Sequence, residues 1–112
     1  MNRSGARAED RCAELLRGAG LVLVERNWRC RLGEIDLIAE DRGVVVFAEV
    51  RMRRSFGFGG AGESVTAAKR ARLIAAARLY LSRQPQVQCR FDVLLVDGPA
   101  GDIKWIRDAF GE

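Results

Sequence analysis

Two carboxylates in neighbouring segments of the sequence have the residue types and spacing of a divalent-metal site. Asp36 lies in GEIDLIAE (33–40) and Glu49 lies in VVVFAEVR (44–51), and both segments have the composition of β-strands. If Arg42-Gly43 is a two-residue hairpin loop, counting outward from it places Asp36 opposite Glu49. Directly opposed β-carbons are about 4.5–5.5 Å apart, and like charges there repel each other. We therefore expect a hard cation such as Mg²⁺ between the two carboxylates.

The same count leaves a second interpretation open. It places Glu34 opposite Arg51, and these two residues together with the two carboxylates would form a surface network that neutralises itself. A slip of the hairpin by one residue would turn one strand's side chains to the other face and separate the carboxylates. The spacing alone therefore allows either a metal site or a charge network.

The histidine and cysteine content limits the kinds of catalysis and metal binding that the chain can support. The chain has no histidine, which excludes Ser-His-Asp and Cys-His schemes, so any catalysis rests on carboxylates, on lysine or arginine, or on a metal. Its three cysteines are odd in number and far apart. We therefore expect free thiols in a reducing compartment rather than disulfides or a structural zinc site.

The elements that must position the carboxylates follow from the hydrophobic pattern. Residues 4–18 and 65–83 show helical periodicity, with Ser4 as a candidate cap of the first helix. The third predicted strand is apolar on both faces and should be central. The predicted order is αβββαββ, an α/β fold with a mixed sheet covered by helices on both faces. The predicted strands are 21–30, 33–40, 44–51, 90–97 and 102–107.

The first predicted helix carries one acidic residue beside its apolar stripe. Glu9 lies about 75–80° from the centre of the stripe at roughly 100° per residue, so it can reach the carboxylate pair or remain a solvated helix residue. The stripe consists of Ala8, Cys12, Leu15, Leu16 and Ala19.

The length and net charge of the chain indicate its number of domains and the kind of partner it favours. The 112 residues are the length of one domain, so we take 1–112 as a single domain. A net charge of +4 and a pI of about 9.5 weakly favour a polyanionic partner. The polar N-terminal segment has no apolar signal region, and no apolar run approaches the roughly 20 residues that span a bilayer. We expect a cytoplasmic protein with no membrane partner.

The stretch around the carboxylates also resembles a known family. GEIDLIA followed by FAEVRMR is similar to the hallmark of the YraN-like proteins of bacteria, which have a restriction-endonuclease-like fold and are similar to archaeal Holliday junction resolvases. The match extends over almost the whole chain. It includes Asn27-Trp28-Arg29-Cys30, Ala77-Arg78-Leu79-Tyr80-Leu81, Arg90-Phe91-Asp92-Val93 and Ala109-Phe110.

The resemblance implies metal-dependent hydrolysis of phosphodiester bonds, most naturally in branched or structured DNA. Asp36, Glu49 and the carbonyl of Val50 would hold Mg²⁺ or Mn²⁺, and Glu9 would match a glutamate of related resolvases. The family's usual lysine is Arg51 here, which stays charged and can hold a phosphate but cannot shed a proton. Further nucleic-acid contacts would come from Arg53, Arg54 and Lys69, or these residues are only solvated.

Three functions remain open at this point: an endonuclease, a nucleic-acid-binding module that cleaves poorly because of Arg51, and a non-catalytic interaction domain. The loop with Phe56 and Phe58 would either stack on an unpaired base or seal a core or dimer interface. A homodimer is possible, since resolvases of this fold class cut a four-way junction at two symmetric positions.

Overall fold

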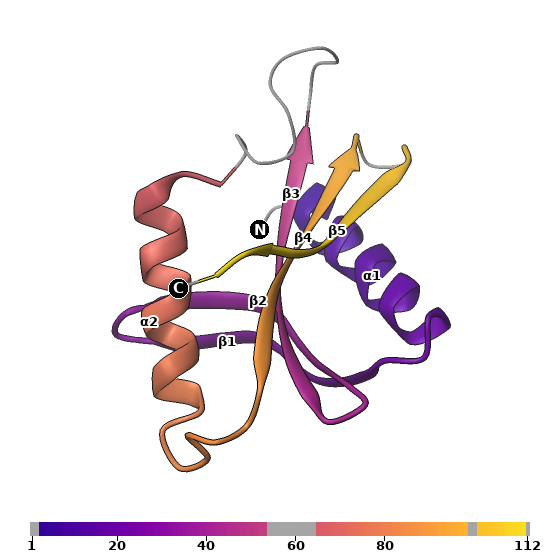
Figure 1. Ribbon diagram of the computed structural model, residues 1–112. Helices are drawn as coiled ribbons and strands as arrows, with labels where there is room; N and C mark the ends of the chain where they lie inside the picture. Colours follow the sequence, from indigo (N-terminus) through magenta and orange to yellow (C-terminus); the bar gives the residue numbers. More distant parts are fainter. Residues whose placement is uncertain (1–2, 54–64, 99–100, 112) are drawn as a thin grey trace.

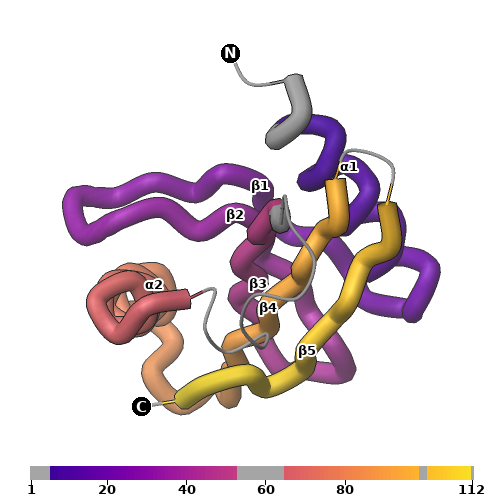
Figure 2. Tube along the Cα trace, turned by 90° about the horizontal axis from the view of Figure 1, so that it is seen from above, coloured from indigo at the N-terminus to yellow at the C-terminus, as the bar shows by residue number. Residues whose placement is uncertain are grey.

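The computed structural model describes residues 3–53, 65–98 and 101–111, without the side chains of residues 3–5 and 53. These segments form a five-stranded mixed sheet in the order β1-β2-β3-β4-β5, with α1 on one face and α2 on the other (Figures 1 and 2). The predicted α/β class and the order αβββαββ are confirmed. The elements are α1 (Arg3–Gly18), β1 (Val22–Cys30), β2 (Gly33–Asp41), β3 (Val44–Arg53), α2 (Ala67–Tyr80), β4 (Cys89–Asp97) and β5 (Ile103–Phe110).

The first helix buries a narrower stripe than the sequence suggested. Ala8, Cys12 and Leu16 are fully buried at intervals of four residues, and Ala13 joins them, whereas Leu15 is 37% exposed. The prediction that Leu15 faces the core is therefore wrong, because the buried face follows the i, i+4, i+8 row. The helix begins at Arg3, so Ser4 lies inside the helix and is not its cap.

The hairpin between β2 and β3 has the predicted two-residue loop. Arg42 and Gly43 have φ angles of 53° and 87°, the left-handed conformations that a tight type I′ turn requires. The ladder runs from Asp41 opposite Val44 to Leu37 opposite Ala48. Beyond that pair β2 leaves β3 and stays paired only with β1, so the β1–β2 hairpin projects beside α2 (Figure 2).

The separation of β2 from β3 corrects one predicted contact. Glu34 was expected opposite Arg51, but it pairs with Arg29 of β1, and its carboxylate lies 3.4 Å from the Arg29 Nε. The predicted network that joins Glu34 to Arg51 is therefore wrong, because the β2–β3 ladder ends three residues before Glu34 would enter it.

The central position predicted for the third strand is confirmed. β3 pairs antiparallel with β2 and parallel with β4, from Val45 opposite Cys89 to Arg53 opposite Asp97. Val46 and Ala48 belong to the core under α1, and Phe47 belongs to the core under α2. Because side chains alternate along a strand, residue 49 faces the same side as Phe47, the side that α2 covers.

The second helix is shorter than predicted and begins with a side-chain cap. Thr66 accepts a hydrogen bond from the Lys69 backbone N–H at 3.1 Å, and the helix ends at Tyr80 rather than at residue 83. Leu73, Ala76 and Ala77 are buried. Arg72, Arg78 and Arg83 are exposed.

A buried aspartate ties the last strand to the sheet. Asp92 of β4 is fully buried and accepts hydrogen bonds from Arg90, from the Trp105 indole at 2.9 Å and from the Asp108 backbone N–H at 3.0 Å. Arg90 also donates to Asp41 at 2.9 Å. Asp108 has a φ of 51° beside a register shift, and past this bulge β5 continues three residues beyond its predicted end at 107.

Within the described segments, neither helix is long and apolar enough to cross a membrane, since α1 has 16 residues and α2 has 14.

Candidate active site

The site lies where β2 leaves β3. Asp36 is the first residue of β2 beyond the ladder, and its Oδ2 accepts a hydrogen bond from the Val50 backbone N–H at 2.9 Å. The Asp36 carboxylate thus accepts the hydrogen bond that a backbone carbonyl of β2 would accept if the ladder continued. Strand geometry points the N–H and C=O of one residue to the same side. The Val50 carbonyl therefore also faces the side of Asp36.

Glu49 is the second carboxylate, and it is almost completely buried. Its side chain is 3% exposed, and its Oε1 has no hydrogen-bond partner among the residues that the structure describes. The other oxygen, Oε2, lies 3.5 Å from the Lys69 Nζ and 3.8 Å from the Arg51 Nη1. A buried carboxylate oxygen without a donor is costly, by roughly 1–3 kcal/mol or more. This oxygen is suited to coordinate a cation.

Glu49 influences the ionisation of Asp36. Burial and, after it, the negative charge of Glu49 together raise the pKa of Asp36 from its ordinary value of 3.8 to about 7. The hydrogen bond from Val50 acts in the opposite direction by stabilising the ionised form. Without a cation, Asp36 therefore holds a proton up to near-neutral pH.

These residues fit a small hard cation. Asp36, Glu49 and the Val50 carbonyl offer oxygen ligands, and Mg²⁺ is commonly held by one or two carboxylates while it keeps several waters. In residues 3–53, 65–98 and 101–111 no three His, Cys, Asp or Glu residues form a metal-binding group. The candidate ligand set therefore consists of two carboxylates and one carbonyl.

Glu9 lies near this site with its carboxylate engaged elsewhere. It accepts a hydrogen bond from the Asn27 Nδ2 at 3.0 Å and lies 3.5 Å from an Arg26 nitrogen. Burial raises the pKa of Cys12 in α1, and the charges of Asp36 and Glu9 act in the same direction, so both carboxylates lie near this thiol. The structure brings Asp36 and Glu49 together and holds Glu9 against β1.

Two of the predicted basic residues meet at Glu49. Arg51 and Lys69 approach the same carboxylate oxygen, one from β3 and one from the first turn of α2. The backbone of Arg53 pairs with Asp97, but its side chain lies outside the described parts of the chain. Arg54 and the loop with Phe56 and Phe58 are also outside the described residues.

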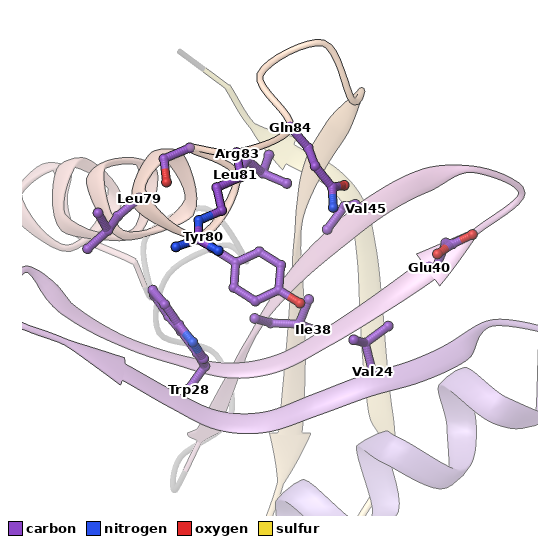
Figure 3. A pocket seen from close by; sticks show the side chains of 11 residues that line it. Val24, Trp28, Ile38, Glu40, Val45, Leu79, Tyr80, Leu81, Arg83 and Gln84 are labelled. Carbon is purple, nitrogen blue, oxygen red and sulfur yellow. The ribbon is translucent and has the colours of Figure 1, made fainter.

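A pocket on the same face lies at the other end of α2. It has a volume of about 530 Å³ between the end of the helix and β1–β3, and neither carboxylate lines it (Figure 3). Tyr80 points from α2 toward the strands within this pocket, and its ring makes edge-to-face contacts with Trp28 and Phe47. The pocket and the carboxylate site are separate features of the molecule.

Comparison with known proteins places the chain in a family. The model of the uncharacterised protein family UPF0102 matches residues 8–96, which include both carboxylates. The chain belongs to the UPF0102 family. A UPF0102 protein of Dechloromonas aromatica (strain RCB) is 52% identical over 106 residues, which cover 95% of this chain and 87% of the relative. The UPF0102 proteins of Nitrosomonas europaea and Pseudomonas putida (strain GB-1) are 51% and 46% identical, and each alignment covers 96% of this chain and 93% of the relative.

Sequence reasoning missed two features of this UPF0102 chain. It treated Lys69 only as a nucleic-acid contact, because nothing in the spacing links this residue to Glu49, 20 positions earlier. It gave no role to Asp92, although one aspartate within the apolar segment RFDVLLVD is a signal of a buried polar network.

Proposed function

We propose that this protein is a metal-dependent endonuclease that hydrolyses phosphodiester bonds in branched or structured DNA. The observation that carries the proposal is the pair of the partly buried Asp36 and the buried Glu49, with Glu49 Oε1 lacking a partner within the described residues. The resemblance of GEIDLIA and FAEVRMR to restriction-endonuclease-like proteins supports the same reading. Mg²⁺ or Mn²⁺ held there would stabilise charge on the phosphate and lower the pKa of a bound water.

The residues around the pair match the demands of this reaction. A water oxygen bonds to phosphorus, the bond from phosphorus to the leaving oxygen breaks, the leaving oxygen gains a proton and the water proton passes to solvent. Arg51 is 42% exposed and extends from β3 beyond Glu49, so its guanidinium can hold a phosphate oxygen. Cutting both strands of a symmetric junction needs two copies of the site, so we expect a homodimer on such DNA.

One observation favours a second candidate function. Arg51 stands where the related pattern has a lysine, and its guanidinium cannot release a proton at neutral pH. A nucleic-acid-binding module with little cleavage activity is therefore the alternative.

The test is cleavage of labelled four-way, flap and linear DNA with Mg²⁺ or Mn²⁺. Asp36→Ala and Glu49→Ala should abolish cutting, whereas Glu34→Ala should not, because Glu34 is on the same strand but pairs with Arg29. Salt-sensitive binding without cutting would favour the binding module, and activity gained by Arg51→Lys would then identify Arg51 as the cause. Neither cutting nor binding would leave a non-catalytic interaction domain.

A further inference from the structure

We propose that Lys69, on α2, is the catalytic lysine of this site and replaces the lysine that the strand motif lacks. This inference rests on the proposed endonuclease function and assigns one of its residues. Lys69 Nζ lies 3.5 Å from Glu49 Oε2, closer than the 3.8 Å of Arg51 Nη1. An amine therefore stands beside the buried carboxylate although the strand itself carries arginine at position 51.

The surroundings of Lys69 suit a role in the reaction. Its side chain is 33% exposed, so one side of the ammonium meets Glu49 and another side meets solvent. An ammonium has three N–H donors. One of them can hold Glu49, while the others orient the attacking water and stabilise charge that develops on the phosphate.

The helix gives Lys69 a fixed position. The Thr66 side chain accepts a hydrogen bond from the Lys69 backbone N–H, and α2 is held to the sheet by Leu73, Ala76 and Ala77. The lysine therefore starts from the capped first turn of a packed helix, which limits its possible positions relative to Glu49. Such rigid support is what a catalytic group requires.

Arginine at position 51 complements this lysine rather than duplicating it. A guanidinium presents a planar fork that matches two phosphate oxygens, whereas an ammonium is a compact point charge that can approach a single water. The two cations at Glu49 Oε2 thus have the two roles that a single strand lysine would otherwise combine. Arg51 holds the phosphate, and Lys69 holds the nucleophilic water.

The experiment compares wild type with Lys69→Ala, Lys69→Arg and the double variant Lys69→Ala/Arg51→Lys. Lys69→Ala should lower kcat by about 100-fold or more, the usual contribution of such a group. Lys69→Arg should remain slow because the fork cannot place a single donor in the same position. The double variant should recover part of the rate, because it returns a lysine to the neighbouring strand position. Arg72→Ala, one turn further along α2 and exposed, is the matched control and should keep kcat.

Two binding measurements separate catalysis from assembly of the site. Lys69→Ala should bind Mn²⁺ at least as tightly as wild type, because a positive charge beside Glu49 has been removed. It should bind junction DNA in Ca²⁺ within about threefold of wild type, since one exposed phosphate contact contributes little. Wild-type kcat in Lys69→Ala or Lys69→Arg, or a loss of Mn²⁺ binding that accounts for the lost rate, would overturn the assignment. An inactive wild type would instead overturn the endonuclease function, and the assignment of Lys69 with it.

Discussion

At the scale of single residues, Asp36 combines burial, a neighbouring carboxylate and one backbone donor. Burial and the charge of Glu49 favour its protonated form, and the Val50 N–H favours its ionised form. The first two effects are stronger, and the pKa rises to about 7. The metal-free folded protein therefore retains a proton that the unfolded chain has already lost, and this difference makes folding stability depend on pH.

Asp36→Asn should remove that dependence. Between the unfolded pKa of 3.8 and the folded pKa of about 7, the folded state binds more protons, so the free energy of unfolding of wild type falls as pH rises through this range. We expect urea unfolding without metal to show wild type losing on the order of a few kcal/mol from pH 4 to pH 8. Asp36→Asn should be the more stable protein at pH 8. Equal pH slopes for the two proteins would contradict this expectation, and Glu14→Gln, which removes an exposed carboxylate paired with Arg17 on α1, is the control.

Divalent metal should stabilise the folded protein at high pH, where the metal-free protein is least stabilised by the proton on Asp36. At pH 8, above its pKa of about 7, Asp36 is mostly ionised, and a cation bound only by the folded state adds stability by mass action. Thermal unfolding with millimolar Mg²⁺ or Mn²⁺ should give a higher Tm for wild type than unfolding with a chelator. The increase should shrink at pH 5, where Asp36 is protonated, and vanish in Glu49→Ala. A Tm that is insensitive to metal at pH 8 would rule out a site at this pair.

At the scale of elements, the hairpin that carries the carboxylates could be predicted because its determinants are local. Arg42 and Gly43 fix the turn, and the turn fixes the ladder as far as Leu37 and Ala48. The departure of β2 from β3 beyond that point could not be predicted. β2 stays paired with β1 while it leaves β3, and neither strand carries a periodic signal of this change.

The contact of Lys69 with Glu49 could not be predicted from the sequence either. Helical periodicity located α2 approximately, but it cannot say against which strand the first turn of the helix will pack. The predicted end at residue 83 was wrong, because the helix ends at Tyr80. Local sequence patterns thus predicted the helices, the strands and one hairpin. The position of Lys69 beside Glu49 could be found only from the tertiary structure.

The Asp92 network should be the strongest polar contribution to sheet stability. Asp92→Ala removes the acceptor of Arg90, Trp105 and the Asp108 N–H, and it leaves a partly buried guanidinium with one partner fewer. Breaking a buried ion pair from one side typically costs about 3–5 kcal/mol. Urea unfolding should show a loss of this size. Lys104→Ala on the exposed side of β5 should change stability by less than about 0.5 kcal/mol.

At the scale of the whole molecule, the net charge of +4 acts together with the local cations at the site. If DNA lies across a few of these charges, its affinity falls by on the order of 10- to 100-fold as salt rises from about 50 to 200 mM. Fluorescence anisotropy in Ca²⁺ measures this fall. Arg51→Ala should reduce the slope of log affinity against log salt by about one phosphate contact. Arg83→Ala, three residues past the end of α2, should leave this slope unchanged. An affinity that does not depend on salt would argue against a phosphate partner.

The parallel pairing of β3 with β4 has a consequence for the order of folding. Val45 pairs with Cys89 across a long crossover that contains α2, whereas the β1–β2 and β2–β3 hairpins join residues close in the chain. Closing short loops costs less entropy, so the hairpins are expected to form before the crossover closes. Asp36 and Glu49 therefore come together within the first 50 residues of the chain, before α2 can bring Lys69 to them. The repulsion between the two carboxylates is weak while water surrounds the hairpin, and it grows as the rest of the sheet and α2 bury them, so a proton or a cation is needed only at that later stage.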